Sequence, residues 1–350
     1  MSAMSNPALF NRIASLEVQI DGLRRHQIAF PTARWNRIST VVVLHGGGIE
    51  GRGEDVSYDP RDQASHLSLP EFELSGTRTV AEWSAVLDTI ALTPTPLVHP
   101  ESSDYRRWAY EGALLDLALR QAGLSLQDAL GRTARPVRFC VSPPGDPLDM
   151  ATMFPNQELK VDAFVGWAPD AMQALSEQGM VRVVDLKAHY VGDWITRPDD
   201  PLAFSRAVAA AFPDVILEDP AVGAYMAPFH EENAGRTSFD APIHRAADLL
   251  ALPPTKWCNI KPSRFGTIER LLECVDYCEG QGISMYGGGQ FEIGPGRAQI
   301  QALASVLYPD GPNDVAPSGY NAARPNADLP QGTLPATTVL GFATAVEMVR

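Results

Sequence analysis

Acidic residues stand at the ends of three successive apolar segments, each about as long as a buried strand. They are Asp185, Glu218 and Asp240, which close the runs Val-Arg-Val-Val-Asp, Val-Ile-Leu-Glu and Thr-Ser-Phe-Asp, and a fourth run ends on Lys261. The steps between these four residues are 33, 22 and 21 residues, and each leaves room for the helical crossover that joins parallel strands. The carboxyl ends of all strands in an α/β barrel open onto one face, so the pattern predicts that these side chains converge.

The residue types at these positions favour metal binding and proton transfer. Three converging carboxylates are a site for a hard cation, because such ions take oxygen ligands. Lys261, one strand further on, is a candidate proton carrier beside that metal.

The segments between the predicted strands contain residues that are typical of the starts and ends of helices. Asp200 followed by a proline starts one predicted helix, and Pro213 stops it. Thr267 starts another, whose apolar residues recur at helical spacing as far as Gly280.

The length and composition of the chain exclude several classes of protein. The 350 residues have room for a barrel of roughly 200 to 250 residues and a smaller domain. A formal charge of −14 argues against a basic groove for nucleic acid and against a polybasic membrane patch. Because neither a run of about 20 apolar residues nor a secretory signal occurs, we expect a cytoplasmic protein. The four cysteines lack metal-finger spacing and are expected to be reduced thiols with packing roles: Cys140, Cys258, Cys274 and Cys278.

The chain is predicted to divide into three parts. Residues 1–134 combine alternating segments with a long helix that Gly123 stops, which is typical of a small α+β domain. Residues 317–350 are rich in Pro, Gly and Asn and are expected to pack back on the first domain as coil, or to be partly disordered. Residues 135–316 alternate strand and helix, and the strand candidates number eight, as in a barrel: 137–142, 158–164, 181–187, 215–218, 236–240, 257–261, 283–287 and 314–316.

Two further lysines lie on predicted barrel strands. The period-two rule puts Lys160 on one face with Glu158 and Asp162, where Asp162 or a metal-binding carboxylate would pair it; the alternative is a solvated edge residue. Lys187 shares the face of Asp185 and is either a salt-bridge partner to a ligand or a base.

Two glycine-rich segments are candidates for contact with a ligand. The loop that follows the seventh strand leads into a helix and could present N–H groups to an anion, with Gln290 and Glu292 lining the site; the alternative is a tight turn. The segment from Gly46 to Tyr58 has the glycine spacing of a dinucleotide fingerprint but no following amphipathic helix. We expect it to be a flexible hairpin that closes over the barrel mouth, where Arg52 would suit a distal carboxylate and Tyr58 a polar substrate end, or else a plain surface loop.

Together these features resemble the enolase superfamily, in the branch of muconate-lactonizing enzymes, o-succinylbenzoate synthases and dipeptide epimerases. The resemblance spans nearly the whole chain, including the helix around Glu111-Gly-Ala-Leu-Leu-Asp-Leu-Ala-Leu. It implies an α/β fold, a modified TIM barrel with an N-terminal α+β capping domain, and a homo-oligomer, either a dimer or an octamer. The residues that it implies for the site are Asp185, Glu218 and Asp240 as ligands of one Mg²⁺ per subunit, Lys261 as the base on strand six, and Lys160 as one lysine of a Lys-x-Lys motif.

The sequence also departs from that family's pattern. Only one lysine of the Lys-x-Lys motif is present, the third strand reads Asp-Leu-Lys where Asp-Ala-Asn is commoner, and the fifth reads Asp-Ala-Pro where Asp-Glu is usual. No histidine stands on strand seven, which disfavours the arrangement of mandelate racemases and sugar-acid dehydratases.

The resemblance implies Mg²⁺-dependent removal of the proton α to a carboxylate, through a metal-stabilised enediolate. The expected reactions on a small carboxylic acid are racemisation or epimerisation, cycloisomerisation and syn-dehydration. The alternatives are a barrel that binds a small ligand without catalysis, an acid-sugar dehydratase, and an aldolase with Lys261 as a Schiff base.

Overall fold

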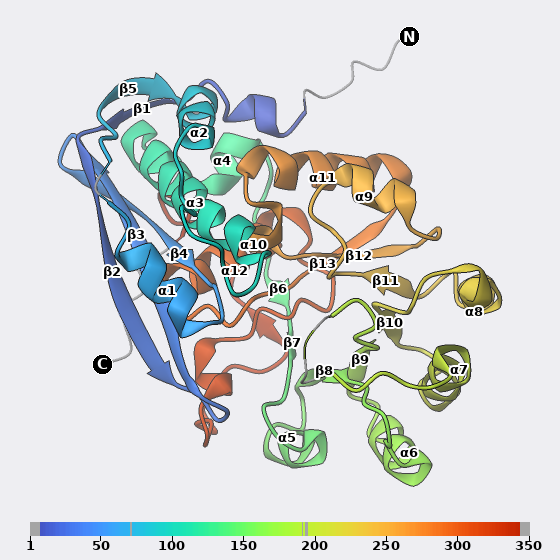
Figure 1. Ribbon diagram of the computed structural model, residues 1–350. Helices are drawn as coiled ribbons and strands as arrows, with labels where there is room; N and C mark the ends of the chain where they lie inside the picture. Colours follow the sequence, from blue (N-terminus) through green and yellow to red (C-terminus); the bar gives the residue numbers. More distant parts are fainter. Residues whose placement is uncertain (1–7, 71, 191, 193–194, 344–350) are drawn as a thin grey trace.

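A curled sheet of seven parallel strands forms the second half of the chain (Figure 1). The computed structural model describes residues 8–70, 72–190, 192 and 195–343. The strands lie side by side in chain order, and helices cover the outer face of the sheet. Their bounds are β7 Cys140–Val141, β8 Glu158–Asp162, β9 Val181–Asp185, β10 Ile216–Glu218, β11 Thr237–Phe239, β12 Trp257–Ile260 and β13 Ser284–Gly287.

The two edges of this sheet are joined by the segment around Asn313. The carbonyl of Asn313 accepts from the N–H of Cys140 at 2.8 Å, and the N–H of Asp314 donates to the carbonyl of Gly287 at 2.8 Å. The expected eighth strand is therefore two isolated bridges rather than a regular strand. The expected first strand, 137–142, is divided in two, since β6 (Val137–Arg138) pairs antiparallel with β14 (Thr333–Leu334) before β7 joins the barrel.

The helices between the strands begin and end at the signals in the sequence. In α7 (Pro201–Ala211) the carboxylate of Asp200 accepts from the backbone N–H of Ala203. The predicted end of α11 (Ile268–Gln281) is wrong: the helix passes through Gly280 and is capped by Gly282, whose φ of 64° is left-handed. The remaining helices are α5 Pro147–Met153, α6 Pro169–Glu177, α8 Ala227–Glu232, α9 Ala246–Ala251, α10 Pro262–Phe265, α11 Ile268–Gln281 and α12 Pro295–Leu307.

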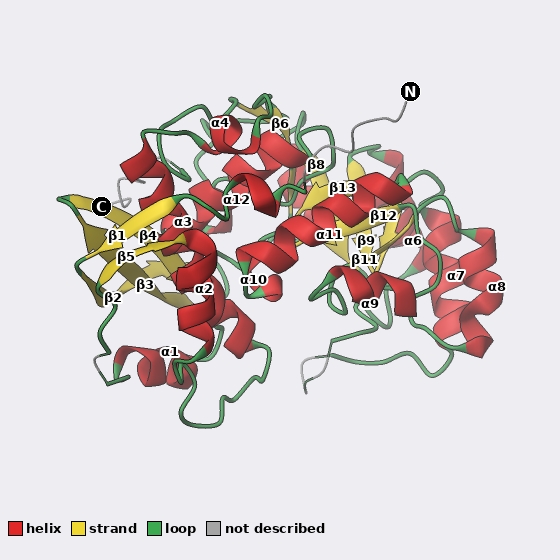
Figure 2. Cartoon of the chain, turned by 90° about the horizontal axis from the view of Figure 1, so that it is seen from above, coloured by secondary structure: helices red, strands yellow, loops and turns green. Residues whose placement is uncertain are grey.

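The first part of the chain is an α+β unit. Its antiparallel sheet has the order β2-β3-β4, and a long helix, α3, lies between this sheet and the barrel (Figure 2). As predicted, α3 ends at Gly123, in a left-handed conformation with φ 67°. The elements are β1 Glu17–Ile20, β2 Gly22–Pro31, β3 Asn36–Gly46, β4 Ile49–Asp55, α1 Pro60–Leu67, β5 Gly76–Thr79, α2 Val80–Asp88, α3 Ser102–Ala122 and α4 Leu126–Leu130.

The segment from Gly46 to Tyr58 is part of a hairpin, as expected, but most of it is regular strand, so the expectation of a flexible loop is wrong. Only Gly47 and Gly48 form the turn between β3 and β4. Two glycines of β4, Gly51 and Gly53, lie against α3 so closely that a Cβ would fall 2.3 Å from the carbonyl oxygen of Ala113 and 2.0 Å from that of Ala109. The glycines serve close packing here rather than flexibility.

We expect Gly53→Ala to destabilise the protein by about 3 kcal/mol, because the added methyl must displace the backbone of α3. Gly145→Ala is the matched control, since a Cβ there would have no heavy atom within 4 Å, and its effect should stay within about 0.5 kcal/mol. Urea unfolding of both variants measures the difference. Equal stability of the two would show that α3 does not depend on this contact.

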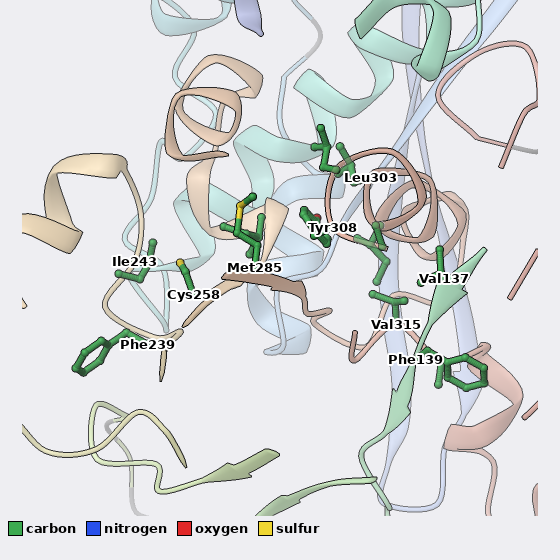
Figure 3. Close-up of a cluster of buried hydrophobic side chains, with 14 of the residues drawn as sticks. Val137, Phe139, Phe239, Ile243, Cys258, Met285, Leu303, Tyr308 and Val315 are labelled. Atoms are coloured by element: carbon green, nitrogen blue, oxygen red, sulfur yellow. The ribbon is translucent and has the colours of Figure 1, made fainter. Parts of the chain in front are cut away.

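The chain after α12 contacts the barrel part through the pairing of β14 with β6, and then the first part through residues 341 and 342. The N–H of Phe342 donates to Asp116 in α3 at 2.9 Å, and the N–H of Gly341 donates to the carbonyl of Leu124 at 2.9 Å. A large apolar core lies between the barrel strands and their helices, and Figure 3 shows part of it, including Phe239 and Val315. None of the helices in the described ranges has the length and apolar character needed to cross a membrane.

Candidate active site

The three strand-end carboxylates converge, as the sequence predicts. Asp185 ends β9, Glu218 ends β10 and Asp240 follows β11, and these strands are neighbours in the sheet. In the parallel register Glu218 lies directly beside Asp185. One oxygen from each carboxylate lies within 4.8 Å of the other two, and all three residues are fully buried.

Each carboxylate contacts a different lysine. The chain has four lysines among its 28 basic residues, and three of them are at this site. An arginine cannot lose its proton in a protein, whereas a lysine can serve as a neutral amine, so the use of lysine here favours proton chemistry. The pairs are Lys160 with Glu218, Lys187 with Asp185 at 2.5 Å, and Lys261 with Asp240 at 2.7 Å.

Two of these lysines approach from opposite sides. Lys160 comes from β8 and Lys261 follows β12, and these strands flank the three that carry the carboxylates. The Nζ atom of Lys160 also lies 3.9 Å from Asp185, and both amines are nearly inaccessible to solvent.

Two neutral side chains hold Glu218, and sequence reasoning missed both. The amide of Asn259 donates to Oε2 at 3.0 Å, and the hydroxyl of Tyr286 donates to the same oxygen. The hydroxyl of Tyr286 also lies 3.0 Å from Ser238. A signal for Asn259 was present, because it lies on β12 two residues before Lys261, and residues two apart in an extended segment share a face.

Asp219, also missed, fixes the backbone that carries Asp240. Its carboxylate accepts from the N–H of Asp240 at 2.8 Å and from the N–H of Ala241 at 3.0 Å. Its own φ of 51° lies in the left-handed region, which is uncommon for a residue with a side chain. The strained backbone at Asp219 therefore serves to place the third carboxylate.

Two more side chains contact Asp240. The hydroxyl of Tyr190 donates to Oδ2 at 3.0 Å, and the guanidinium of Arg264 lies 3.5 Å from the same oxygen. Arg264 follows Lys261 by three residues, so the short helix α10 brings both cations to one carboxylate.

The charged groups of the site shift one another's pKa values. Burial lowers the pKa of Lys160, but Glu218 and Asp185 outweigh it and hold the pKa well above its usual value. Burial also raises the pKa of Glu218, against the opposing effect of Lys160. Burial would likewise raise the pKa of Asp240, but Arg264 and Lys261 bring it below its usual range. The carboxylates beside Lys160 therefore favour its protonated form, which acts as their counter-ion.

The donor set fits a hard divalent cation. All three residues offer carboxylate oxygens, which Mg²⁺ and Ca²⁺ prefer. Oδ1 of Asp240 is buried and has no hydrogen-bond partner among the described residues, so it is a free ligand atom. An unpartnered buried oxygen is costly unless something else binds it.

Lys187 and Asp162 lie at the rim of the site. The Nζ atom of Lys187 is 3.1 Å from Asp162, whose side chain is about half exposed. A cavity of about 520 Å³ opens beside Lys187, at the carboxyl ends of β8 to β10, and exposed apolar residues such as Phe164 and Tyr225 line it.

Three other predicted site residues form one hydrogen-bonded group. The amide of Gln290 accepts from Tyr58 at 2.7 Å and donates to Tyr105 at 3.0 Å. The carboxylate of Glu292 accepts from the N–H of Gln290 at 2.9 Å, and the guanidinium of Arg297 lies 3.4 Å from its other oxygen. These residues tie the loop after β13 to the first part of the chain.

The expected anion site in this loop is already filled by the protein. The carboxylate of Glu54, from β4, accepts from the N–H groups of Ile293, Gly294 and Gly296 at 2.8, 2.9 and 3.0 Å. The prediction of an external anion at this helix start is therefore wrong, because a buried side chain from another part of the chain takes that place.

Arg52 also lies elsewhere than expected. Its guanidinium pairs with Glu50 at 3.1 Å on the face of β4 opposite the glycines that contact α3. Because the pair is exposed and β4 is a regular strand, the structure does not bring Arg52 to the carboxylates.

The chain is similar to proteins of known activity. It is 24% identical to an o-succinylbenzoate synthase from Geobacillus kaustophilus over 340 residues, which is 83% of this chain and 80% of that protein. A shorter match, 37% identical over 78 residues, covers 22% of this chain and 20% of an N-succinylamino acid racemase from Amycolatopsis sp.

Solved structures with the same fold cover nearly the whole chain. A dipeptide epimerase from Methylococcus capsulatus, in complex with Mg and the dipeptide L-Arg-D-Lys, has a TM-score of 0.72 at 18% identity, over 93% of this chain and 99% of that one. A muconate cycloisomerase from Pseudomonas fluorescens has a TM-score of 0.70 at 16% identity, over 93% and 96% of the two chains.

Two family models match in sequence. Residues 11–129 match the N-terminal domain, and residues 133–322 the C-terminal domain, of a family described as a domain of unknown function, DUF8230. The chain therefore belongs to the DUF8230 family, and it has the modified barrel fold of the enolase superfamily.

Proposed function

We propose that this protein is an isomerase or lyase that removes the proton α to the carboxylate of a small acid. The observation that carries the proposal is the order of side chains across the sheet, with carboxylates on β9, β10 and after β11 and a lysine on each flanking side. Sequence relatives that are named for synthase and racemase activities support the same class of reaction. The reactions that fit are racemisation or epimerisation, cycloisomerisation and syn-dehydration.

We propose one Mg²⁺ per subunit, held by Asp185, Glu218 and Asp240. When bound, Mg²⁺ supplies Lewis-acid stabilisation of the negative charge that develops on the carboxylate group of the substrate. The related epimerase structure that contains Mg supports this choice of ion.

Two lysines of the chain transfer the α-proton of the substrate. Lys261 takes the α-proton on one side of the substrate, and Lys160 returns a proton from the other side, which inverts the carbon. Where the substrate has a leaving group, one lysine acts as the base and the other remains an electrostatic partner. Asn259 and Tyr286 keep Glu218 in place, and the near-complete burial of both amines keeps water from the reacting carbon.

The rim residues are proposed to contact the rest of the substrate. Lys187 lines the cavity of about 520 Å³ and pairs with Asp185 and with Asp162, so it lies between that cavity and the carboxylates. Tyr58, Gln290 and Glu292 are proposed to line the side of the site that faces the first part of the chain.

One observation favours a second candidate, a barrel that binds a small ligand without catalysis. Each carboxylate already has its own lysine, and such pairs could be purely structural. The two functions differ in metal binding, because a structural network of ion pairs would take up no Mg²⁺.

Calorimetry with Mg²⁺ tests the proposal. We expect one site in the natural protein and at least a tenfold loss of affinity in Asp240→Asn, which keeps the shape of the side chain but removes its charge. Asp310→Ala, at a highly exposed position, is the control and should bind normally. Equal Mg²⁺ affinity in all three proteins, or none in any, would contradict the proposed metal site.

A further inference from the structure

Three of the four cysteines gather on the outer side of the barrel, away from the carboxylates. Cys258 lies in β12, and Cys274 and Cys278 lie one turn apart on α11, which packs beside it. All three are fully buried, and their Sγ atoms lie within 4.8 Å of one another. Figure 3 shows Cys258 in the apolar layer between strands and helices.

The backbone explains why this cluster is separate from the proposed active site. Successive residues of a strand point to opposite faces, so Asn259 contacts Glu218 while Cys258 faces the helix layer. On α11, a spacing of four residues puts both cysteines on the side that faces the sheet.

The environment of these thiols is rich in soft donors. Met285 of β13 is the register partner of Cys258, so its thioether stands on the same face of the sheet. The thiolate is the form of cysteine that binds metals, and the three sulfurs lie close enough together to hold one ion between them.

We propose that Cys258, Cys274 and Cys278 form a binding site for one soft, thiophilic metal ion. Sulfur ligands select Cu⁺ and Zn²⁺ over the hard ions that suit carboxylates. With metal–sulfur bonds of about 2.3 Å, the sulfurs of such a site are about 3.8–4.0 Å apart, a separation compatible with the limit of 4.8 Å on the present distances. Each thiol that binds releases its proton to solvent, and neither the sulfur nor the metal changes oxidation state.

Two other roles for the three cysteines, packing and disulfide formation, predict different experimental results. Thiols that only fill space would bind no metal, and a pair that is poised for oxidation would form a disulfide instead. This proposal is independent of the proposed function, because the two sites use different residues on opposite faces of β12.

Cadmium titration of the reduced, chelator-treated protein tests the site. In anaerobic buffer with excess Mg²⁺ to compete with Cd²⁺ for any carboxylate, we expect ultraviolet thiolate-to-Cd²⁺ absorbance, which carboxylates do not produce, that saturates at one equivalent. Zn²⁺ and Cu⁺, titrated in separate arms to large excess over Cd²⁺, should compete for the same site, and the ion that lowers the absorbance at the lower concentration binds more tightly of the two.

Cysteine variants show whether the Cd²⁺ absorbance comes from the three clustered cysteines. Cys274→Ser and Cys278→Ala should each lower the Cd²⁺ affinity at least tenfold, whereas Cys140→Ser and Asp240→Asn should leave it unchanged. Cys140 is an apt control, since it is equally buried but bonds to the carbonyl of Pro312. Absence of the absorbance, or equal affinity in Cys278→Ala, would overturn the proposal.

Thiol labelling of the natural protein covers the case in which a variant fails to fold. Bound Cd²⁺ should slow maleimide labelling of the three clustered cysteines at least tenfold and leave that of Cys140 unchanged. Equal labelling rates with and without metal, or a disulfide as the only product under oxidation, would equally overturn the proposal.

Discussion

Lys261→Arg is expected to lower α-proton exchange with solvent by at least about a hundredfold, the scale of general-base catalysis. Arginine keeps the positive charge beside Asp240, where Lys261 lies 2.7 Å from Oδ2. It cannot accept a proton, because the guanidinium does not lose its own near neutral pH. The variant therefore removes proton transfer while it preserves the ion pair. Incorporation of deuterium from D₂O into acids that the natural protein turns over is the measurement.

Lys256→Arg makes the same change at an exposed position and should exchange at the natural rate. Mg²⁺ binding of Lys261→Arg, measured by calorimetry, separates a lost proton carrier from a lost metal site. Full exchange by Lys261→Arg would exclude Lys261 as the base, whatever the result for the metal.

Glu54→Ala is expected to destabilise the protein by about 3 kcal/mol. The Glu54 carboxylate accepts from three backbone N–H groups at the start of α12, and two of these bonds are fully buried. A buried donor that loses its only partner costs about 1–3 kcal/mol. The effect is reduced because burial raises the pKa of Glu54, which shows that holding its charge inside the protein is itself unfavourable. Urea unfolding measures the change.

Glu50→Ala is the matched control for this prediction. Glu50 lies on the same strand but pairs with Arg24 and Arg52 at the surface, where such pairs contribute at most about 1 kcal/mol. If Glu54→Ala were no less stable than Glu50→Ala, the hydrogen bonds from the start of α12 to Glu54 would not stabilise the loop that carries Gln290 and Glu292.

The sequence by itself determined where the main site residues lie along the strands. Buried parallel strands read as largely apolar runs, and in this chain a charged residue stands at the end of each of four such runs. Asp185, Glu218, Asp240 and Lys261 are such residues, and the topology of parallel strands alone brings them to one edge. Caps such as Asp200 and stops such as Gly123 are equally local and were predicted for that reason.

Only the tertiary structure decided which side chains meet across separate elements. Nothing local to Tyr286 indicates that its hydroxyl reaches Glu218, 68 residues away, and Glu54 lies 239 residues or more from the N–H groups that it caps. Glycine was the most misleading signal. Gly51 and Gly53 have the composition of a flexible loop, but they are required because the backbone of α3 leaves no room for a Cβ. A glycine in a sequence records the absence of a side chain, and only the packed structure shows whether that absence permits motion or close approach.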